Sequence, residues 1–503
     1  MIRKVLVANR GEIAVRIMRS CREMDIASVA VYSEADRKSQ HVRYATEAYF
    51  IGASPSSESY LNIDKIIEVA KKSGADAIHP GYGFLSENAE FARRVTAEGI
   101  KFIGPTPEAI TAMGDKVTAR KIMMQAGVSV VPGTNENLEN DEDIQRVAAQ
   151  IGYPLIIKAS AGGGGKGMRL VNSEKELISS YHLAKSEART AFSNDTVYIE
   201  KYIESPHHIE FQILADKYGK VIHLFERECS VQRRHQKVVE ETPSPLMTAE
   251  LRLKMGEQAI AAAKSVNYEG AGTIEFLVDE HHHFYFLEMN TRLQVEHPIT
   301  ERVTGVDLVK QQIMIADGKH LALNQNELRQ FGHAIECRIY AEDPDNNFMP
   351  SPGLIKHITE PHGLGVRTDG YVYEGYEIPI YYDPLITKLI VWAQTRNEAI
   401  QRMKRALYEY KITGIKTSIP FLKRIMDTPA FVSGKYNTHF IADNEEALLK
   451  REDCDQECED IAMFVAYLDY TTKINAETLN HTSTGNNSSS WRDYSKSKSV
   501  HRY

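Results

Sequence analysis

Several features that would place a protein in a membrane or on nucleic acid are missing from this 503-residue chain. No apolar run approaches the roughly 20 residues of a membrane-spanning helix. The first residues, MIRKVLVANRG, enter an apolar segment at once, with neither a signal peptide nor a transit segment, so we expect a cytoplasmic protein. The formal net charge is −8 and the pI is near 6.2, which argues against a nucleic-acid partner.

Cysteine is also scarce, with five residues that are scattered and odd in number. Cys454 and Cys458 are the closest pair, but no second pair and no nearby histidine completes a zinc-binding spacing. The cysteines therefore indicate reduced thiols in the cytoplasm, without a structural metal.

Two common nucleotide motifs are absent as well. The first strand-to-helix turn contains only Gly11, so no G-x-G-x-x-G dinucleotide fingerprint is present. The glycine-rich stretch 162–167 is followed by Met168 and is not a Walker A loop. Strands nevertheless alternate with helices over the first hundred residues, which predicts a parallel, doubly wound α/β sheet.

The pattern changes further along the chain. From about residue 128, short strands surround a helix at 174–191, which indicates a small α+β unit. A helix is expected at 249–266, a β-rich region follows residue 331, and another helix is expected near 397–410. Residues 443–460 hold nine acids and two bases; a short amphipathic helix is expected near 461–470, and the Ser/Asn-rich end after 480 cannot bury a core.

The segment AGGGGKG, at 161–167, lies between two predicted strands. Consecutive glycines allow backbone N–H groups to converge on a phosphate without side chains in the way. Lys158 on the preceding strand can add a positive charge. An ordinary surface hairpin is the alternative, but such a hairpin needs only one or two glycines.

An acidic hairpin is the second candidate site. GTIEFLVD (272–279) and FYFLEMN (284–290) flank the turn EHHH, and folding about that turn places Asp279 opposite Phe284, Leu277 opposite Phe286, and Glu275 opposite Glu288. Opposed residues hold their Cβ atoms roughly 5 Å apart, so two carboxylates there require a cation. Mg²⁺ favours such carboxylates together with phosphate oxygens, and Asn290 offers a further oxygen. The turn histidines, His281 to His283, are better explained as a polar turn.

The hairpin continues into EMNTRLQVE, where polar residues alternate. An extended strand would project five side chains from one face into a cleft: Glu288, Asn290, Arg292, Gln294 and Glu296. The cation-rich run ECSVQRRHQKVVEETPSP (228–245) is either an anion-binding segment or a solvated face. HPGYGFLSEN (79–88) is either a ligand-facing turn at a strand's carboxyl end or a tight connection.

These motifs together resemble biotin carboxylases of the ATP-grasp superfamily, over residues 1 to about 447. The motif ECRIYAEDP (336–344) extends the resemblance. It implies a Rossmann-like domain at 1–114, an ATP-grasp domain at 115–330 with a mobile lid at about 130–204, and a β-rich domain at 331–447. Residues 448–503 are expected to form an extension, a short helix plus a flexible tail.

The resemblance also implies residue roles. The residues matching nucleotide-binding positions are Lys116, Lys158, Gly162, Gly163, Gly164, Gly165, Glu200, Lys201, Ile203, His208, Gln232, His235, Glu275 and Glu288. Glu275, Glu288 and Asn290 match metal-site positions, for Mg²⁺ or Mn²⁺. Those matching the bicarbonate and biotin site are Lys237, Arg292, Gln294, Val295, Glu296 and Arg338. Four of these are the expected catalytic residues: Arg292, Glu296, Lys237 and Arg338.

In the implied reaction, MgATP phosphorylates bicarbonate, and the carboxyl group passes to biotin on a carrier protein. Glu296 is expected to accept the bicarbonate proton, while Arg338 steadies the biotin enolate. No A-M-K-M biotin attachment site occurs in this sequence, so we expect the carrier to be a separate chain. A homodimer and a separate carboxyltransferase subunit are expected too, in an acetyl- or propionyl-CoA carboxylase or, alternatively, a pyruvate carboxylase. Another ATP-grasp ligase and a non-catalytic nucleotide-binding subunit remain as rivals.

Overall fold

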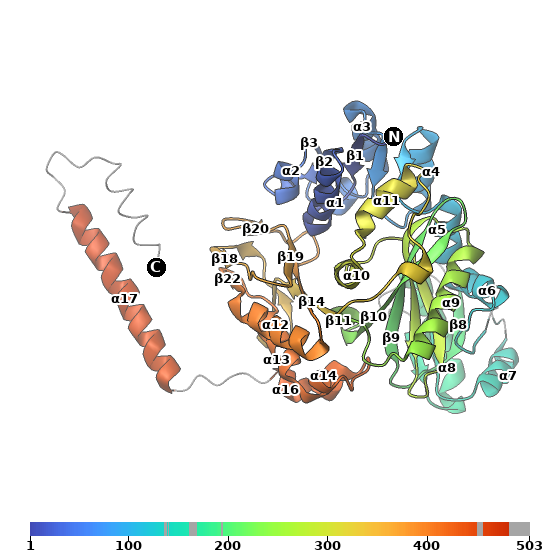
Figure 1. Cartoon of the computed structure of the whole chain (residues 1–503). Helices are drawn as coiled ribbons and strands as arrows, with labels where there is room; N and C mark the ends of the chain where they lie inside the picture. The colour runs from blue at the N-terminus through green and yellow to red at the C-terminus, as the bar shows by residue number, and fades with distance from the viewer. Residues whose placement is uncertain (135–137, 139, 160–167, 193–194, 450–455, 482–503) are drawn as a thin grey trace. The chain divides into compact units, whose positions relative to one another are not determined.

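The computed structural model describes residues 1–134, 138, 140–159, 168–192, 195–449 and 456–481. The chain divides into two compact units, residues 1–449 and residues 450–503 (Figure 1). The glycines at 162–165, expected to bind phosphate, lie outside the described residues. Among the described residues, no helix is long and apolar enough to cross a membrane.

The first hundred residues form the expected parallel sheet, with strand order β3-β2-β1-β4-β5. Its elements are β1 (Lys4–Val7), α1 (Gly11–Glu23), β2 (Ala27–Ser33), α2 (Gln40–Tyr44), β3 (Glu47–Gly52), α3 (Ile63–Ser73), β4 (Ala77–His79), α4 (Ala89–Ala97) and β5 (Lys101–Phe102). The strands β1, β2 and β4 are almost wholly buried, as expected for a parallel sheet covered on both faces, whereas the edge strands β3 and β5 are partly exposed. Two helices, α5 (Pro107–Gly114) and α6 (Lys116–Gln125), then lead into the next part.

A single eight-stranded antiparallel sheet joins the central and C-terminal parts of the first unit. In spatial order its strands are β13 (Phe284–Asn290), β12 (Gly270–Val278), β9 (His207–Ala215), β10 (Val221–Arg233), β11 (Gln236–Thr242), β14 (His333–Tyr340), β21 (Leu385–Ala393) and β19 (Val366–Gly370). Because β11 pairs directly with β14, side chains from both regions share one sheet face.

Helices and short strand pairs complete this part. The helices are α9 (Ala249–Ser265), α10 (His297–Thr304), α11 (Leu308–Ala316), α12 (Arg396–Glu409), α13 (Ile419–Asp427), α14 (Pro429–Ser433), α15 (Phe440–Asp443) and α16 (Glu445–Leu449). The strand pairs are β15 (Glu342–Asp343) with β16 (Met349–Pro350), β17 (Gly353–Leu354) with β20 (Glu377–Ile378), and β18 (His357–Thr359) with β22 (Lys411–Thr413).

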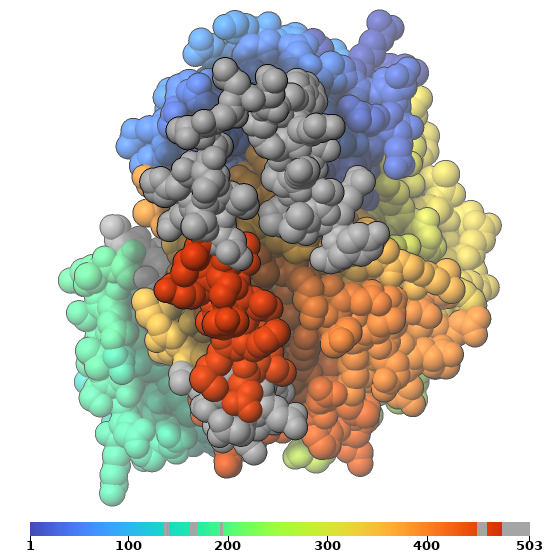
Figure 2. Space-filling view, turned by 90° about the vertical axis from the view of Figure 1, so that its left-hand side faces the viewer, coloured from blue at the N-terminus to red at the C-terminus, as the bar shows by residue number. Residues whose placement is uncertain are grey.

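A small three-stranded sheet lies in the region expected to be the lid. It is formed by β6 (Leu155–Ala159), β7 (Met168–Val171) and β8 (Val197–Lys201), with α7 (Asp141–Ile151) and α8 (Glu174–Phe192) packed on it. β6 and β7 pair as an antiparallel hairpin, so the glycine segment connects two strands as predicted. In Figure 2 this region is the teal surface at the lower left.

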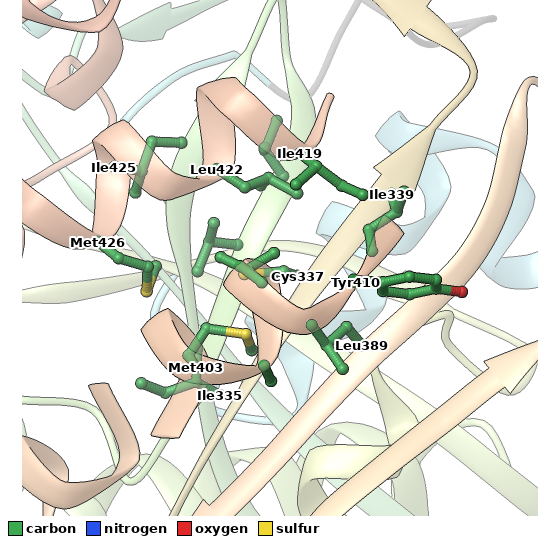
Figure 3. Packing of buried hydrophobic residues seen from close by; sticks show 14 of the residues in the cluster. Ile335, Cys337, Ile339, Leu389, Met403, Tyr410, Ile419, Leu422, Ile425 and Met426 are labelled. Atoms are coloured by element: carbon green, nitrogen blue, oxygen red, sulfur yellow. The ribbon is translucent and has the colours of Figure 1, made fainter. Parts of the chain in front are cut away.

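The core of the C-terminal part determines which side chains of β14 can reach the opposite face. Alternate residues of β14 point to opposite faces of the sheet. Ile335, Cys337 and Ile339 pack against apolar side chains of α12 and α13, as Figure 3 shows. Glu336 and Arg338 therefore project from the other face, toward α10, and are themselves buried.

The described residues of the second unit form one helix, α17 (Gln456–His481). It is longer than the short helix expected near 461–470, since Thr, Lys and Ala residues beyond Tyr470 continue it. It is also less amphipathic than expected, because apolar side chains occur nearly all round it between residues 461 and 474. Each of these large apolar side chains is at least 42% exposed.

Candidate active site

A cavity of about 1270 Å³ in the first unit brings together nearly all the predicted site residues. Those lining it are Lys116, Lys158, Glu200, Lys201, Ile203, His208, Gln232, His235, Lys237, Glu275, Glu288, Asn290, Arg292, Gln294, Val295 and Arg338. Among the predicted residues that the structure describes, Glu296 is the exception: it is fully buried and does not line the cavity. Residues far apart in the sequence thus form one site.

The acidic hairpin pairs Glu275 directly with Glu288, as predicted. The outer pairing differs by one residue from the prediction, because Val278 lies opposite Phe284 and Leu277 opposite Tyr285. The loop is longer than assumed, with Asp279 N–H bonded to the His283 carbonyl at 2.9 Å. A β-bulge after Glu275 absorbs the offset and restores the acidic pair.

The two carboxyl groups of this pair are in different electrostatic states. Burial alone would raise the pKa of Glu275, but Lys237 and His208 outweigh it and hold that pKa well below its usual range. The Lys237 ammonium lies 2.9 Å and the His208 Nε2 2.8 Å from its carboxylate. Burial and the charge on Glu275 raise the pKa of Glu288.

A divalent cation fits this pair. The ionised Glu275 carboxylate repels a second negative charge and so raises the pKa of Glu288. A cation bound between the two carboxyl groups would remove this repulsion. The Asn290 amide donates to Glu275 Oε1 at 2.9 Å, while its own oxygen accepts from Arg292 at 3.0 Å. Asn290 therefore orients the charged groups in this structure.

Lys237 is the central cation of the site. Its ammonium lies 2.5 Å from Glu210, 2.9 Å from Glu275 and 2.7 Å from Glu296. Burial would lower the pKa of Lys237, but these three carboxylates raise it well above its usual range. A permanently charged lysine here ties the metal-site acid to the expected catalytic base.

Glu296 is held between two cations. It accepts hydrogen bonds from Lys237 at 2.7 Å and from Arg338 at 3.0 Å. Burial would raise its pKa, but Lys237 and Arg338 hold the pKa well below the usual range. The residue also directly precedes α10, whose N-terminal dipole favours a negative charge. In this state Glu296 is ionised but only weakly basic.

Arg292 leaves the strand on which it was predicted. β13 ends at Asn290, and Arg292 and Gln294 belong to the following loop, residues 291–296. The Arg292 guanidinium donates to Glu87 Oε2 at 2.8 Å and to Gln294 Oε1 at 3.0 Å. Glu87 also accepts from the Thr291 N–H at 3.0 Å, so it anchors the loop where it leaves the strand.

Arg338 on β14 forms the opposite wall. Its Nε donates to Glu240 Oε1 at 2.6 Å, and its Nη2 reaches Glu296. Burial raises the pKa of Glu240 to about 7, against the effect of Arg338. Arg338 thus links Glu296 to a second buried carboxyl group, that of Glu240, which was not named as a site residue from the sequence.

Two lysines expected to bind phosphate, Lys116 and Lys158, also line the cavity. Lys116 begins α6, whose first turn is capped by Asp115 accepting from the Thr118 N–H at 2.8 Å. The Lys158 ammonium lies 2.8 Å from Glu200. The Lys201 ammonium donates to the Tyr153 carbonyl at 2.8 Å, so its side chain points away from the pocket it borders.

Comparisons with known proteins agree with this architecture. Residues 1–110 match the family described as "Biotin carboxylase, N-terminal domain", 115–324 match "Carbamoyl-phosphate synthase L chain, ATP binding domain", and 336–443 match "Biotin carboxylase C-terminal domain". Biotin carboxylase 1 of Bacillus subtilis is 56% identical over 88% of this chain and 98% of its own length. The chain belongs to the biotin carboxylase family. Its members are ligases, and the fold and reaction type predicted from the motifs are confirmed.

Relatives within the biotin carboxylase family serve different acceptors. A pyruvate carboxylase subunit of Methanothermobacter thermautotrophicus is 58% identical over 88% of this chain and 90% of its own. A solved biotin carboxylase domain dimer of the Hydrogenobacter thermophilus 2-oxoglutarate carboxylase, in complex with MgADP, ADP and bicarbonate, is 50% identical with a TM-score of 0.86. It covers 90% of this chain and 100% of that chain.

Several residues of this biotin carboxylase site were missed at the sequence level. They include Glu12, Tyr82, Glu87, Glu210, Arg227, Glu240 and Lys388. The motif at 79–88 includes Tyr82 and Glu87, and the run 228–245 includes Glu240, so these residues lay in segments singled out from the sequence, although none was named as a site residue. For the motif at 79–88, a role as a mere connection was left open. The structure favours the ligand-facing alternative, since Tyr82 lines the cavity.

Proposed function

We propose that this biotin carboxylase uses MgATP and bicarbonate to carboxylate biotin presented by a separate carrier protein. The observation that carries the proposal is the single cavity in which a facing acid pair, two lysines and the 291–296 loop converge. Structures of relatives with MgADP and bicarbonate support it.

We assign the metal to Glu275 and Glu288, with Asn290 beside them. A bound Mg²⁺ or Mn²⁺ would neutralise phosphate charge as it develops during transfer. We assign the binding of the phosphates to Lys116 and Lys158, together with the glycines at 162–165, which lie outside the described residues. Glu200, Lys201, Ile203, His208, Gln232 and His235 complete the nucleotide pocket.

We assign bicarbonate to Arg292, Gln294 and the Val295 backbone. Glu296 removes the bicarbonate proton so that an oxygen can attack the γ-phosphorus, and Lys237 stabilises the charge that develops. For Glu296 to act as the base, its contacts with Lys237 or Arg338 must loosen once anions enter the cavity. Arg338 then stabilises the biotin enolate during carboxyl transfer.

The test is bicarbonate-dependent ATP hydrolysis that rises with free biotin. A different ATP-grasp ligase would hydrolyse ATP without biotin stimulation, and a non-catalytic protein would bind ATP without hydrolysis. The Glu296→Gln variant is the matched control, because it preserves the side-chain shape and removes the base.

The proposal keeps the domain boundaries expected from the sequence. It also takes the protein to be a homodimer located in the cytoplasm. The acceptor is an acyl-CoA in our first proposal. Pyruvate is the second, favoured by the 58% identity to the methanogen pyruvate carboxylase chain. Reconstitution with each type of carboxyltransferase decides between them.

We also propose that α17 docks on the carboxyltransferase-bearing subunit. Successive helical residues turn by about 100°, which produces two apolar stripes: Ile461, Phe464, Val465 and Leu468 in one, and Met463, Tyr467, Tyr470 and Ile474 in the other. Asp469 and Lys473, paired at 2.6 Å, share the remaining side. A single helix packed against α17 would cover only one of these stripes, whereas a groove in another protein would cover both.

The carboxyltransferase is a better partner for α17 than the carrier. A broad apolar contact holds its partner continuously, whereas the carrier must move its biotin between two active sites. Deleting residues 450–503, or changing Phe464→Asp, is expected to abolish co-elution with the carboxyltransferase subunit while free-biotin carboxylation persists. Lys473→Glu on the polar side is the control. Unchanged co-elution of the deletion variant contradicts the proposal, as does an effect confined to self-association.

A further inference from the structure

Two neighbouring strands each direct a cation at the loop 291–296. Arg338 on β14 and Lys388 on β21 lie directly opposite each other in the antiparallel pair. The adjacent residues on these strands, Cys337 and Leu389, pack in the core on the other face (Figure 3). Both cations therefore project from the sheet face below α10, although two opposed like charges normally destabilise a strand pair.

The two cations form hydrogen bonds with consecutive residues of the loop 291–296. Arg338 binds the Glu296 carboxylate, whereas the Lys388 ammonium donates to the Val295 backbone carbonyl at 2.8 Å. Lys388 is 0% exposed and does not line the cavity. Burying an ammonium group costs considerable desolvation energy, so a buried lysine destabilises the fold unless specific partners bind it.

Lys388 also connects the loop to the N-terminal domain. Its ammonium lies 3.2 Å from Glu12 at the start of α1 and 6.0 Å from the centre of the Tyr82 ring. The Tyr82 hydroxyl donates a hydrogen bond to the same Glu12 carboxylate. Glu12 and Tyr82 both line the cavity, so Lys388 joins two of its walls from behind.

We propose that Lys388 is a positioning residue for bicarbonate, an inference that rests on the proposed function of the 291–296 loop. By holding the Val295 carbonyl toward the sheet, Lys388 keeps a partial negative charge away from the anion and leaves the loop's N–H and guanidinium groups facing it. Through Glu12 and Tyr82 it also fixes the distance between this loop and the N-terminal wall.

The experiment compares Lys388→Met with Lys4→Met in the full chain. Lys4 offers the same chemistry away from the cavity, since its ammonium donates to the Glu47 carboxylate at 2.7 Å and to the Ser73 carbonyl at 2.8 Å. For K388M we expect the KM for bicarbonate to rise at least about tenfold, because a charge-assisted hydrogen bond that orders the loop is lost. The KM for MgATP should stay within about twofold, and K4M should change neither value.

Lys388→Arg is expected to recover part of the bicarbonate affinity. If K388M fails to fold because Glu12 loses its partner, the double variant K388M/E12Q, compared with E12Q alone, carries the same test. An unchanged KM for bicarbonate in K388M or the double variant overturns the inference, and so does an equal rise for bicarbonate and MgATP. Gln294→Ala separates the two hypotheses: if it raises the KM for bicarbonate but K388M does not, only the role of Lys388 fails.

Discussion

Replacing Glu288 with glutamine is expected to stabilise the metal-free protein while removing its activity. The two carboxyl groups at 275 and 288 are directly opposed on β12 and β13, and Lys237 and His208 keep Glu275 ionised. Glu288 is therefore the member of the pair that bears the repulsion. An amide at that position keeps the size of the side chain without its charge.

The magnitude follows from the spacing. Opposed residues on paired strands lie roughly 5 Å apart, and two unit charges at that distance repel by about 3 kcal/mol at an effective dielectric constant of 20. Lys116, His208 and Lys237 offset part of this repulsion, and Glu288 is partly exposed to the cavity. We expect E288Q to gain about 1 kcal/mol in the free energy of unfolding, with about 3 kcal/mol as the upper bound.

The gain should depend on pH. Because the pKa of Glu288 is raised in the folded state, the folded protein retains a proton that the unfolded chain releases above its own pKa. The wild-type Glu288 carboxyl group therefore lowers the free energy of unfolding only slightly near pH 4.5, and lowers it progressively more as the pH rises. The advantage of E288Q should be small at pH 5 and larger at pH 8.

Urea denaturation with EDTA at both pH values measures this difference. Glu241→Gln is the control of opposite sign, since His333 and Arg396 outweigh burial and lower the pKa of Glu241 to about 2. That variant should be destabilised at both pH values, by up to about 3 kcal/mol, because the stability linked to Glu241 is lost only as the pH falls from about 4.5 toward 2.

Adding MgADP completes the assay. The wild-type protein should gain stability from the ligand, and E288Q should gain much less. The reasoning is refuted if E288Q is less stable than wild type at pH 8 in EDTA, or if its difference from wild type is the same at both pH values.

Three further substitutions test the site. Glu296→Gln should lower bicarbonate-dependent ATP hydrolysis by about 100-fold or more while ADP affinity changes by less than about twofold, and parallel losses would show a structural effect. Arg338→Met should abolish the stimulation of ATP hydrolysis by biotin, with Arg338→Lys partly active; full stimulation in R338M would exclude it from the biotin step. Glu87→Gln should raise the KM for bicarbonate by about tenfold, because Arg292 loses its charged partner, and an unaltered KM would leave Glu87 without a role in the loop.

Local sequence patterns predicted the parts of the site that are close along the chain. The pairing of Glu275 with Glu288 required only a short hairpin, and even there the outer register was off by one until the bulge corrected it. The antiparallel hairpin around the glycine segment was likewise readable from two short apolar runs. The predicted helices at 174–191 and 249–266 match α8 and α9 within one residue at each end.

The charged residues that contact the site residues from distant parts of the chain could not be predicted from local sequence patterns. Glu87 meets Arg292 across 205 residues, and Lys388 meets the Val295 carbonyl across 93. No periodicity links these positions, and each charged residue alone is equally compatible with a solvated surface. Sheet order was the missing information, because the pairing of β11 with β14 and of β14 with β21 places Glu240, Arg338 and Lys388 on one buried face.

In the mechanism that we propose, with Glu296 as the base, the contacts of Glu296 keep this base inactive in the resting site. A carboxylate whose pKa lies well below its usual range accepts a proton poorly, and Lys237 and Arg338 are the cause. Both cations are also the groups expected to meet anionic substrates, so an arriving bicarbonate or phosphate competes with Glu296 for them. As they turn toward the substrate, the carboxylate loses its stabilising charges and its pKa rises inside a buried site. Substrate binding and activation of the base are then the same event, which restricts proton abstraction to a loaded cavity.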